Sequence, residues 1–146
     1  MKTMMSVLVA AFLLTAPAAF AGGAGVGDPA PDFTLSDLEG NDVTLSKIEG
    51  VRVLEWVNPD CPFVKRHYKA GTMKSLAAEY GDKGVTWLTI NSTHYMDREA
   101  NQNFAKANGL SQAILLDPTG KVGHLYGAAT TPQMFIIDGG GNIVYA

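Results

Sequence analysis

Apolar and polar residues alternate over two short stretches near the start of the chain, residues 33–35 and 43–45. A period of two is typical of a strand with one buried face. The turn sequence at residues 38–41 lies between the two stretches. This pattern predicts a short β-hairpin.

Further along the chain, apolar runs rich in β-branched and aromatic residues predict additional strands. They cover residues 51–57, 85–90, 113–116 and 134–137, and a last short strand is expected at 143–145. The second of these runs is almost continuously apolar, which is typical of a strand buried on both faces of a parallel sheet.

The period changes to three and four between Phe63 and about Tyr80, which predicts one helix with Gly71 as a weak point in its middle. A second helix is expected from Asp97, a good cap, to about residue 108, and Gly109 stands in the usual terminating position.

One further helical turn is expected at residues 121–126. Strands that alternate with helices predict an α/β fold with a mixed central sheet, helices on both faces and an antiparallel pair at one edge.

The first residues have the pattern of a secretory signal peptide. Lys2 precedes the apolar run Ser6–Leu14, and Ala19–Ala21 has the small-x-small form of a cleavage site. The apolar run is too short for a stable bilayer span. We therefore expect a signal peptide over residues 1–21, a flexible lead-in over 22–27 and one domain over 28–146, with an N-terminal membrane tether as the alternative.

The predicted export places the mature protein in the periplasm or outside a bacterial cell, with no membrane attachment after cleavage. A chain of 146 residues with 47% hydrophobic and 17% charged residues fits one globular domain. Its net charge of -3 gives no basic footprint for nucleic acid. A single cysteine excludes an intramolecular disulfide and a cysteine-rich zinc site.

That cysteine, Cys61, lies between a predicted strand and the predicted start of a helix. The free N–H groups and the partial positive charge of a helix N-terminus favour the thiolate over the thiol. Lys65, Arg66 and His67 add positive charge, and Pro62 suits the first helical turn. A buried, inert thiol is the alternative.

The segment Trp56–Val64 (WVNPDCPFV) resembles the active-site loop of thioredoxin-like redoxins in the alkyl hydroperoxide reductase/thiol-specific antioxidant superfamily. Residues 27–35 are similar to the opening hairpin of that superfamily. Thr131 and Pro132, before an apolar strand, are similar to the segment with its cis-proline, which faces the reactive cysteine.

The resemblance implies a thioredoxin-like fold, no cofactor and no metal site. It implies that Cys61 and Pro132 are catalytic. The supporting or substrate-binding residues that it implies are Trp56, Asn58, Pro62, Lys65, Arg66 and Thr131.

The chain departs from the family pattern in three ways. Val64 stands where thioredoxins carry their second cysteine, so this chain alone cannot shuttle an internal disulfide. Asn58 and Leu54 stand where peroxiredoxins carry a Thr or Ser and a Pro. No closing helix follows the last predicted hairpin, from which we expect a truncated C-terminus and a sheet face left partly uncovered.

These residues predict a thiol-dependent oxidoreductase, and the family resemblance implies antioxidant activity as well. The Cys61 thiolate attacks a disulfide or a peroxide, and an external thiol or a thiol–disulfide partner protein resolves the product. The missing Thr or Ser favours the disulfide. The alternative is a non-catalytic thioredoxin-fold module that binds a protein or copper, although Cys61 with one of the scattered histidines is a weak copper site.

Overall fold

The computed structural model describes residues 23–146, so the predicted signal peptide lies outside the described residues. The strands are β1 (Thr34–Ser36), β2 (Asp42–Thr44), β3 (Arg52–Val57), β4 (Thr86–Asn91), β5 (Ala113–Leu116), β6 (Gln133–Ile137) and β7 (Ile143–Tyr145). The helices are α1 (Pro62–Lys69), α2 (Thr72–Gly81), α3 (Arg98–Asn108) and α4 (Lys121–Tyr126), with a 3-10 turn, η1, at Leu45–Lys47. Each predicted strand is present within about a residue of its expected bounds.

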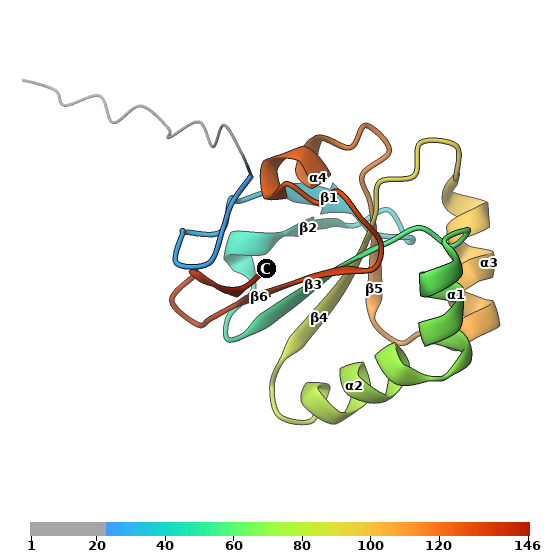
Figure 1. Ribbon diagram of the computed structural model, residues 1–146, viewed down its shortest axis with the longest axis horizontal. Helices are drawn as coiled ribbons and strands as arrows, with labels where there is room; N and C mark the ends of the chain where they lie inside the picture. Colours follow the sequence, from blue (N-terminus) through green and yellow to red (C-terminus); the bar gives the residue numbers. More distant parts are fainter. Residues whose placement is uncertain (1–22) are drawn as a thin grey trace, which may run out of the picture.

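One mixed sheet holds all of these strands in the order β2-β1-β5-β4-β3-β6-β7 (Figure 1). The central strands β3, β4 and β5 run parallel, and β6 runs antiparallel to β3. An antiparallel pair was expected at one edge, and the structure has one at each, β1–β2 and β6–β7.

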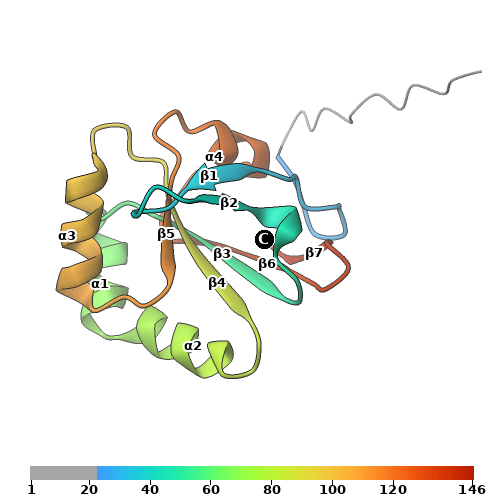
Figure 2. The same ribbon diagram turned by 180° about the vertical axis from the view of Figure 1, so that it is seen from behind.

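Helices cover both faces of the sheet, as predicted (Figures 1 and 2). Alternate residues of β3 face opposite ways: Leu54 and Trp56 pack with residues of α4, whereas Val53 and Val57 pack with residues of α1 and α2. Phe104 of α3 packs on the second cluster. β3 is therefore buried on both faces of the sheet. The loop that follows Val57 begins from this fixed strand.

The helix expected from Phe63 to Tyr80 is two helices, so this prediction was wrong in one respect. Gly71 has φ of 74°, in the left-handed region, and it separates α1 from α2. A glycine adopts this conformation without the penalty that a Cβ atom brings. The break lets Tyr68 of α1 and Met73 of α2 both pack on the same face of the sheet.

The caps of α3 are those the sequence predicted. The Asp97 carboxylate accepts a hydrogen bond from the N–H of Ala100 at 2.8 Å, and Gly109 ends the helix with φ of 59°.

The lead-in is part of the domain over the residues that the structure describes, which corrects the expectation of a flexible segment. Ala24 is buried, and the N–H of Gly27 donates to the carbonyl of Ile143 at 2.8 Å. Gly23 approaches Gly127 so closely that a Cβ atom at position 23 would lie 2.7 Å from the Gly127 Cα. Small residues therefore let this segment pack against the end of α4.

An apolar groove of about 440 Å³ lies between α2 and one end of the sheet. Val51, Val53, Leu76, Tyr80, Val85, Trp87, Met134, Ile136 and Tyr145 line it. Among residues 23–146, none of the helices has the length and hydrophobicity needed to cross a bilayer.

Candidate functional site

A tight turn between β3 and α1 sets the position of Cys61. The Asn58 side-chain oxygen accepts from the N–H of Asp60 at 2.8 Å, and the Asn58 carbonyl accepts from the N–H of Cys61 at 2.9 Å. Cys61 is then the N-cap of α1 in an extended conformation, and Pro62 opens the helix. The thiol is free, half-buried and located at the helix N-terminus, as the sequence predicted.

The segment before β6 lies directly opposite this thiol. The peptide bond between Thr131 and Pro132 is cis. The Cys61 Sγ atom lies 3.1 Å from the Thr131 carbonyl oxygen, and the thiol donates a hydrogen bond to it. The structure thus brings together Cys61, Thr131 and Pro132, which are far apart in the chain.

The surroundings hold the pKa of the Cys61 thiol below its ordinary value. A hydrogen bond with the Thr131 side chain is the largest cause, followed by the N–H of Val64, then the N–H of Phe63 and the charge of Lys65. The Thr131 carbonyl acts in the other direction, because it can accept a hydrogen bond only from the protonated thiol. Partial burial of the sulfur also raises the pKa, but the donors and the Lys65 charge outweigh these opposing effects, and the net shift is downward.

The charged residues of the loop differ in their relation to Cys61. Lys65 forms an exposed ion pair with Asp60 at 3.4 Å and contributes to the low pKa of the thiol. Arg66 is exposed, and its side chain makes neither a hydrogen bond nor an ion pair within residues 23–146. Of these two residues, only Lys65 is among the causes that lower the pKa of Cys61.

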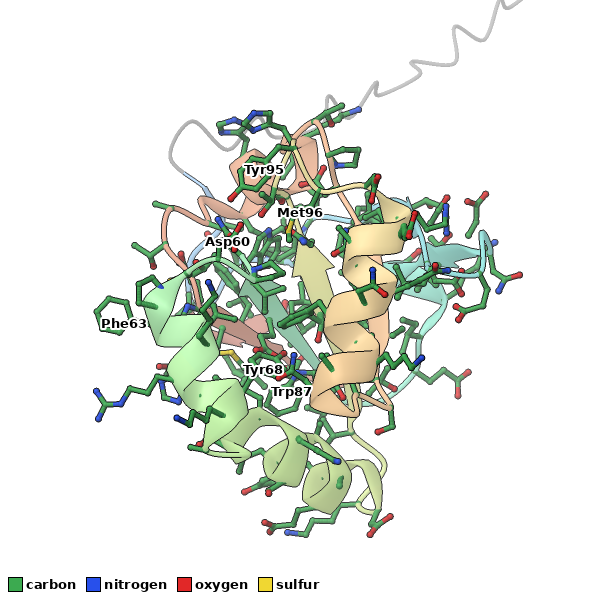
Figure 3. All side chains as sticks on the ribbon, turned by 90° about the vertical axis from the view of Figure 1, so that its right-hand side faces the viewer. Asp60, Phe63, Tyr68, Trp87, Tyr95 and Met96 are labelled. Atoms are coloured by element: carbon green, nitrogen blue, oxygen red, sulfur yellow. The ribbon has the colours of Figure 1, made fainter. Side chains whose placement is uncertain are left out.

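Two aromatic side chains flank the loop on the surface. Tyr95 donates a hydrogen bond to the Asp60 carboxylate at 3.3 Å and is 59% exposed. Phe63 is 64% exposed and points away from α1 into solvent, as Figure 3 shows. The apolar ring of Phe63, two residues after Cys61, is therefore open to contact from outside the protein.

A cleft of about 360 Å³ borders the site on the side of Thr131. Its lining residues are Trp56, Val57, Asn58, Ser92, Thr93, His94, Tyr95, Ala128, Ala129, Thr130 and Thr131. The buried Trp56 donates through Nε1 to the Ser92 hydroxyl at 3.3 Å, and Ser92 donates to the buried Asp117 at 2.7 Å. This chain of hydrogen bonds fixes the indole, so Trp56 is both a core residue and part of the cleft wall.

A buried carboxyl group lies on the other side of the sheet, beneath α1. Glu55 is fully buried in β3 and accepts hydrogen bonds from the Tyr68 hydroxyl at 3.0 Å and from Trp87 Nε1 at 2.9 Å. Figure 3 shows Tyr68 and Trp87 together between the helices and the sheet. Burial raises the pKa of Glu55, and the two hydrogen bonds offset part of that effect.

Within residues 23–146, no group of three His, Cys, Asp or Glu side chains is arranged to hold a metal ion. His94 stacks edge to face on Tyr95, with ring centroids 5.3 Å apart.

Sequence reasoning missed Glu55, Ser92, Tyr95 and Asp117. A signal existed for Glu55, because a charged residue in the middle of an apolar strand marks a buried, hydrogen-bonded group. Ser92 and Tyr95 have no local signal, since they reach the site only through the parallel pairing of β3 with β4.

Comparisons with known proteins agree with this geometry. A family profile described as the AhpC/TSA family matches residues 26–146. The thiol-disulfide oxidoreductase ResA of Halalkalibacterium halodurans is 32% identical over 122 residues, which cover 83% of this chain and 67% of that protein.

Two solved structures illustrate the likeness in three dimensions. A Chlorobium tepidum protein provisionally assigned as the thiol:disulfide interchange protein DsbE superimposes with a TM-score of 0.73 at 27% identity, covering 84% of each chain. The thioredoxin domain of a thiol-disulfide oxidoreductase from Bacteroides vulgatus superimposes with a TM-score of 0.70 at 22% identity, covering 84% of this chain and 88% of that one.

Proposed function

The chain belongs to the AhpC/TSA family and has a thioredoxin-like fold, and on this premise we propose that it is a thiol–disulfide oxidoreductase with Cys61 as its single nucleophile. The observation that carries the proposal is the position of the Cys61 sulfur, which lies at the N-terminus of α1 and 3.1 Å from the Thr131 carbonyl. The helix N-terminus supplies donors that stabilise a thiolate, and the segment of Thr131, whose carbonyl accepts from the protonated thiol, forms the wall opposite the sulfur.

The proposed reaction has two steps. The Cys61 thiolate attacks one sulfur of a disulfide, so that a mixed disulfide forms and the other sulfur leaves as a thiolate. An external thiolate then attacks the mixed disulfide, which returns Cys61 as a thiolate and joins the two other sulfurs. Val64 occupies the position of a local resolving thiol, so the second thiol comes from outside residues 1–146.

The residues around the sulfur have separate roles in this proposal. Asn58 and Pro62 hold the turn and the helix start that place the thiol, and Lys65 and the Thr131 side chain stabilise its charge. Pro132 and the Thr131 backbone form the opposite wall, and Trp56 closes the cleft beside it. Arg66 has no role in the proposed site.

A disulfide fits the site better than a peroxide. Asn58 stands where peroxiredoxins carry the hydroxyl that orients a peroxide, and its side-chain oxygen instead holds the Asp60 N–H. The exposed Phe63 and Tyr95 offer apolar contacts to a protein or peptide disulfide. Attack on a peroxide, which would give a sulfenic acid, is the secondary activity.

The test is reduction of insulin disulfides with dithiothreitol as the external thiol, together with the intact mass of the protein after incubation with oxidised glutathione. We expect insulin reduction, and a glutathione adduct that Cys61→Ser abolishes. A folded wild-type protein that neither forms the adduct nor reduces insulin, while it binds a protein or copper, would be a binding module and would overturn the proposal. Consumption of hydrogen peroxide in parallel measures the secondary activity.

We also propose that the protein acts outside the cytoplasm, because residues 1–21 have the pattern of a signal peptide. Its intact mass after expression in a bacterial host checks this, with Gly22 as the expected first residue. A periplasmic product that keeps residues 1–21 would instead support a membrane tether.

A further inference from the structure

The loop of residues 128–131 carries the Thr131 carbonyl to the Cys61 sulfur, and few hydrogen bonds hold it. Ala128 donates its N–H to the carbonyl of Gly123 at 2.9 Å. Ala129 and Thr130 are exposed, and the structure pairs their N–H groups with no other backbone group in residues 23–146. The loop therefore needs a further support between Ala128 and Thr131.

Gln133 provides that support. Its side-chain oxygen Oε1 accepts from the N–H of Ala129 at 3.0 Å, from the N–H of Thr130 at 3.3 Å and from the Thr130 hydroxyl at 3.5 Å. One oxygen thus gathers three donors from two successive residues of the loop.

The backbone of Gln133 is itself anchored in the sheet. Gln133 is the first residue of β6, and it pairs with Trp56 of β3, the strand that leads to Cys61. Its side-chain oxygen reaches Ala129 and Thr130 of the loop. The loop and the cysteine are therefore positioned from the same pair of strands.

We propose that Gln133 is a positioning residue for Cys61, because it holds residues 129–131 in the conformation that places Thr131 against the sulfur. The proposal deepens the function proposed above and rests on it, since it concerns the reactivity of the same thiol. Gln133 does not touch the sulfur and takes no part in bond making.

Gln133→Met tests the role, because methionine has nearly the same length and removes the acceptor oxygen. We expect amide hydrogen exchange to become faster at Ala129 and Thr130 and to stay unchanged in β3 and β6. Displacement of Thr131 also removes its side-chain hydrogen bond, the largest cause of the low pKa of Cys61. The pH profile of Cys61 alkylation by iodoacetamide should therefore shift to higher pH, with a rate at pH 7 at least about threefold lower. Gln102→Met on the exposed face of α3 is the matched control and should alter neither readout.

Gln133→Glu is the rescue variant, because it keeps an acceptor oxygen at the same place. It should retain the slow exchange of Ala129 and Thr130, and loss of that protection would overturn the proposal. The proposal would also be overturned by a folded Gln133→Met protein in which amide exchange at Ala129 and Thr130 is fast but the pH profile of Cys61 alkylation is unchanged. An ordinary thiol profile in the wild type would contradict the proposed nucleophile instead, whereas the exchange data would still decide the role of Gln133 in the loop.

Discussion

The Cys61 sulfur lies 3.1 Å from the Thr131 carbonyl oxygen, although 70 positions separate the two residues in the chain. The antiparallel pairing of β3 with β6 creates this contact, since Cys61 follows one strand and Thr131 precedes the other. The pairing of β3 with β6 therefore positions both the thiol and the cleft wall opposite it. Substitutions in either loop should change the pKa of Cys61.

Removing the Thr131 hydroxyl should raise the pKa of Cys61, because the hydrogen bond from this side chain is the largest cause of its low value. For Thr131→Val we expect Cys61 alkylation at pH 7 to be roughly three to ten times slower, since a hydrogen bond to a charged group is worth about 1.5 kcal/mol or less at a partly exposed site. Iodoacetamide labelling across pH measures the effect. Thr119→Val, an exposed change on the α4 side, should leave the profile unaltered.

Lys65 and Arg66 should behave differently although they are neighbours. Lys65→Met should slow alkylation at pH 7 by less than about threefold, because an exposed charge is well screened by water. The difference from wild type should vanish in 1 M salt, where screening acts over about 3 Å. Arg66→Met should be alkylated at the wild-type rate at low salt and in 1 M salt. An equal effect of the two substitutions would contradict the conclusion that Lys65, and not Arg66, lowers the pKa of Cys61.

Glu55 should make the stability of the protein depend on pH. Its folded pKa lies above the ordinary value of 4.5, so the folded protein keeps this proton at pH values where the unfolded chain releases it. The contribution of Glu55 is fully present below about pH 4.5 and is lost as the pH rises through the higher folded value.

Glu55→Gln removes this titration and keeps the hydrogen bonds. The glutamine oxygen can accept from Trp87, and the Tyr68 hydroxyl can accept from the glutamine NH₂ group. We expect the variant to be more stable than wild type at pH 7 by about 1 kcal/mol or more, with the gap closing towards pH 4. Urea unfolding at several pH values measures it, and the exposed Glu49→Gln is the control.

Val64→Cys should restore a local resolving thiol, because Val64 lies three residues after Cys61 in the first turn of α1. We expect the oxidised variant to lose two hydrogen atoms in its intact mass and to reduce insulin over repeated cycles. Val53→Cys adds a thiol at the far end of β3 and should form no internal disulfide. A Val64→Cys protein that folds but stays reduced under the same oxidant would argue against the position assigned to this turn.

The break between α1 and α2 depends on Gly71. Gly71→Ala should lower the free energy of unfolding by about 1 kcal/mol, because φ of 74° disfavours a Cβ atom. Within residues 23–146, apart from the adjacent residues and the local helix backbone, no atom lies within 4 Å of a Cβ atom placed at Gly71 or Gly81, so steric crowding affects neither variant. Gly81→Ala, in the last turn of α2, should stabilise the protein by about 0.4–1 kcal/mol. Urea unfolding of the two variants provides the test.

The sequence by itself determined the order and type of nearly every element, the caps of α3 and the place of Cys61 at a helix start. These features depend on neighbours a few residues apart, so periodicity and capping residues reveal them directly. The family resemblance of residues 27–35, 56–64 and 131–132 is confirmed by the match over residues 26–146. The sequence indicated that Gly71 weakens the predicted helix of residues 63–80. It could not show whether the helix ends at this glycine or continues through it.

Only the tertiary structure decided which distant groups meet. The register of β3 against β4 and β6 places Ser92 beside Trp56 and Thr131 against Cys61, and it buries Glu55 between Tyr68 and Trp87. Likewise, the close approach of Gly23 to Gly127 is what makes the lead-in part of the domain. Such contacts join residues tens of positions apart through packing and strand register, and no local pattern in the chain encodes them.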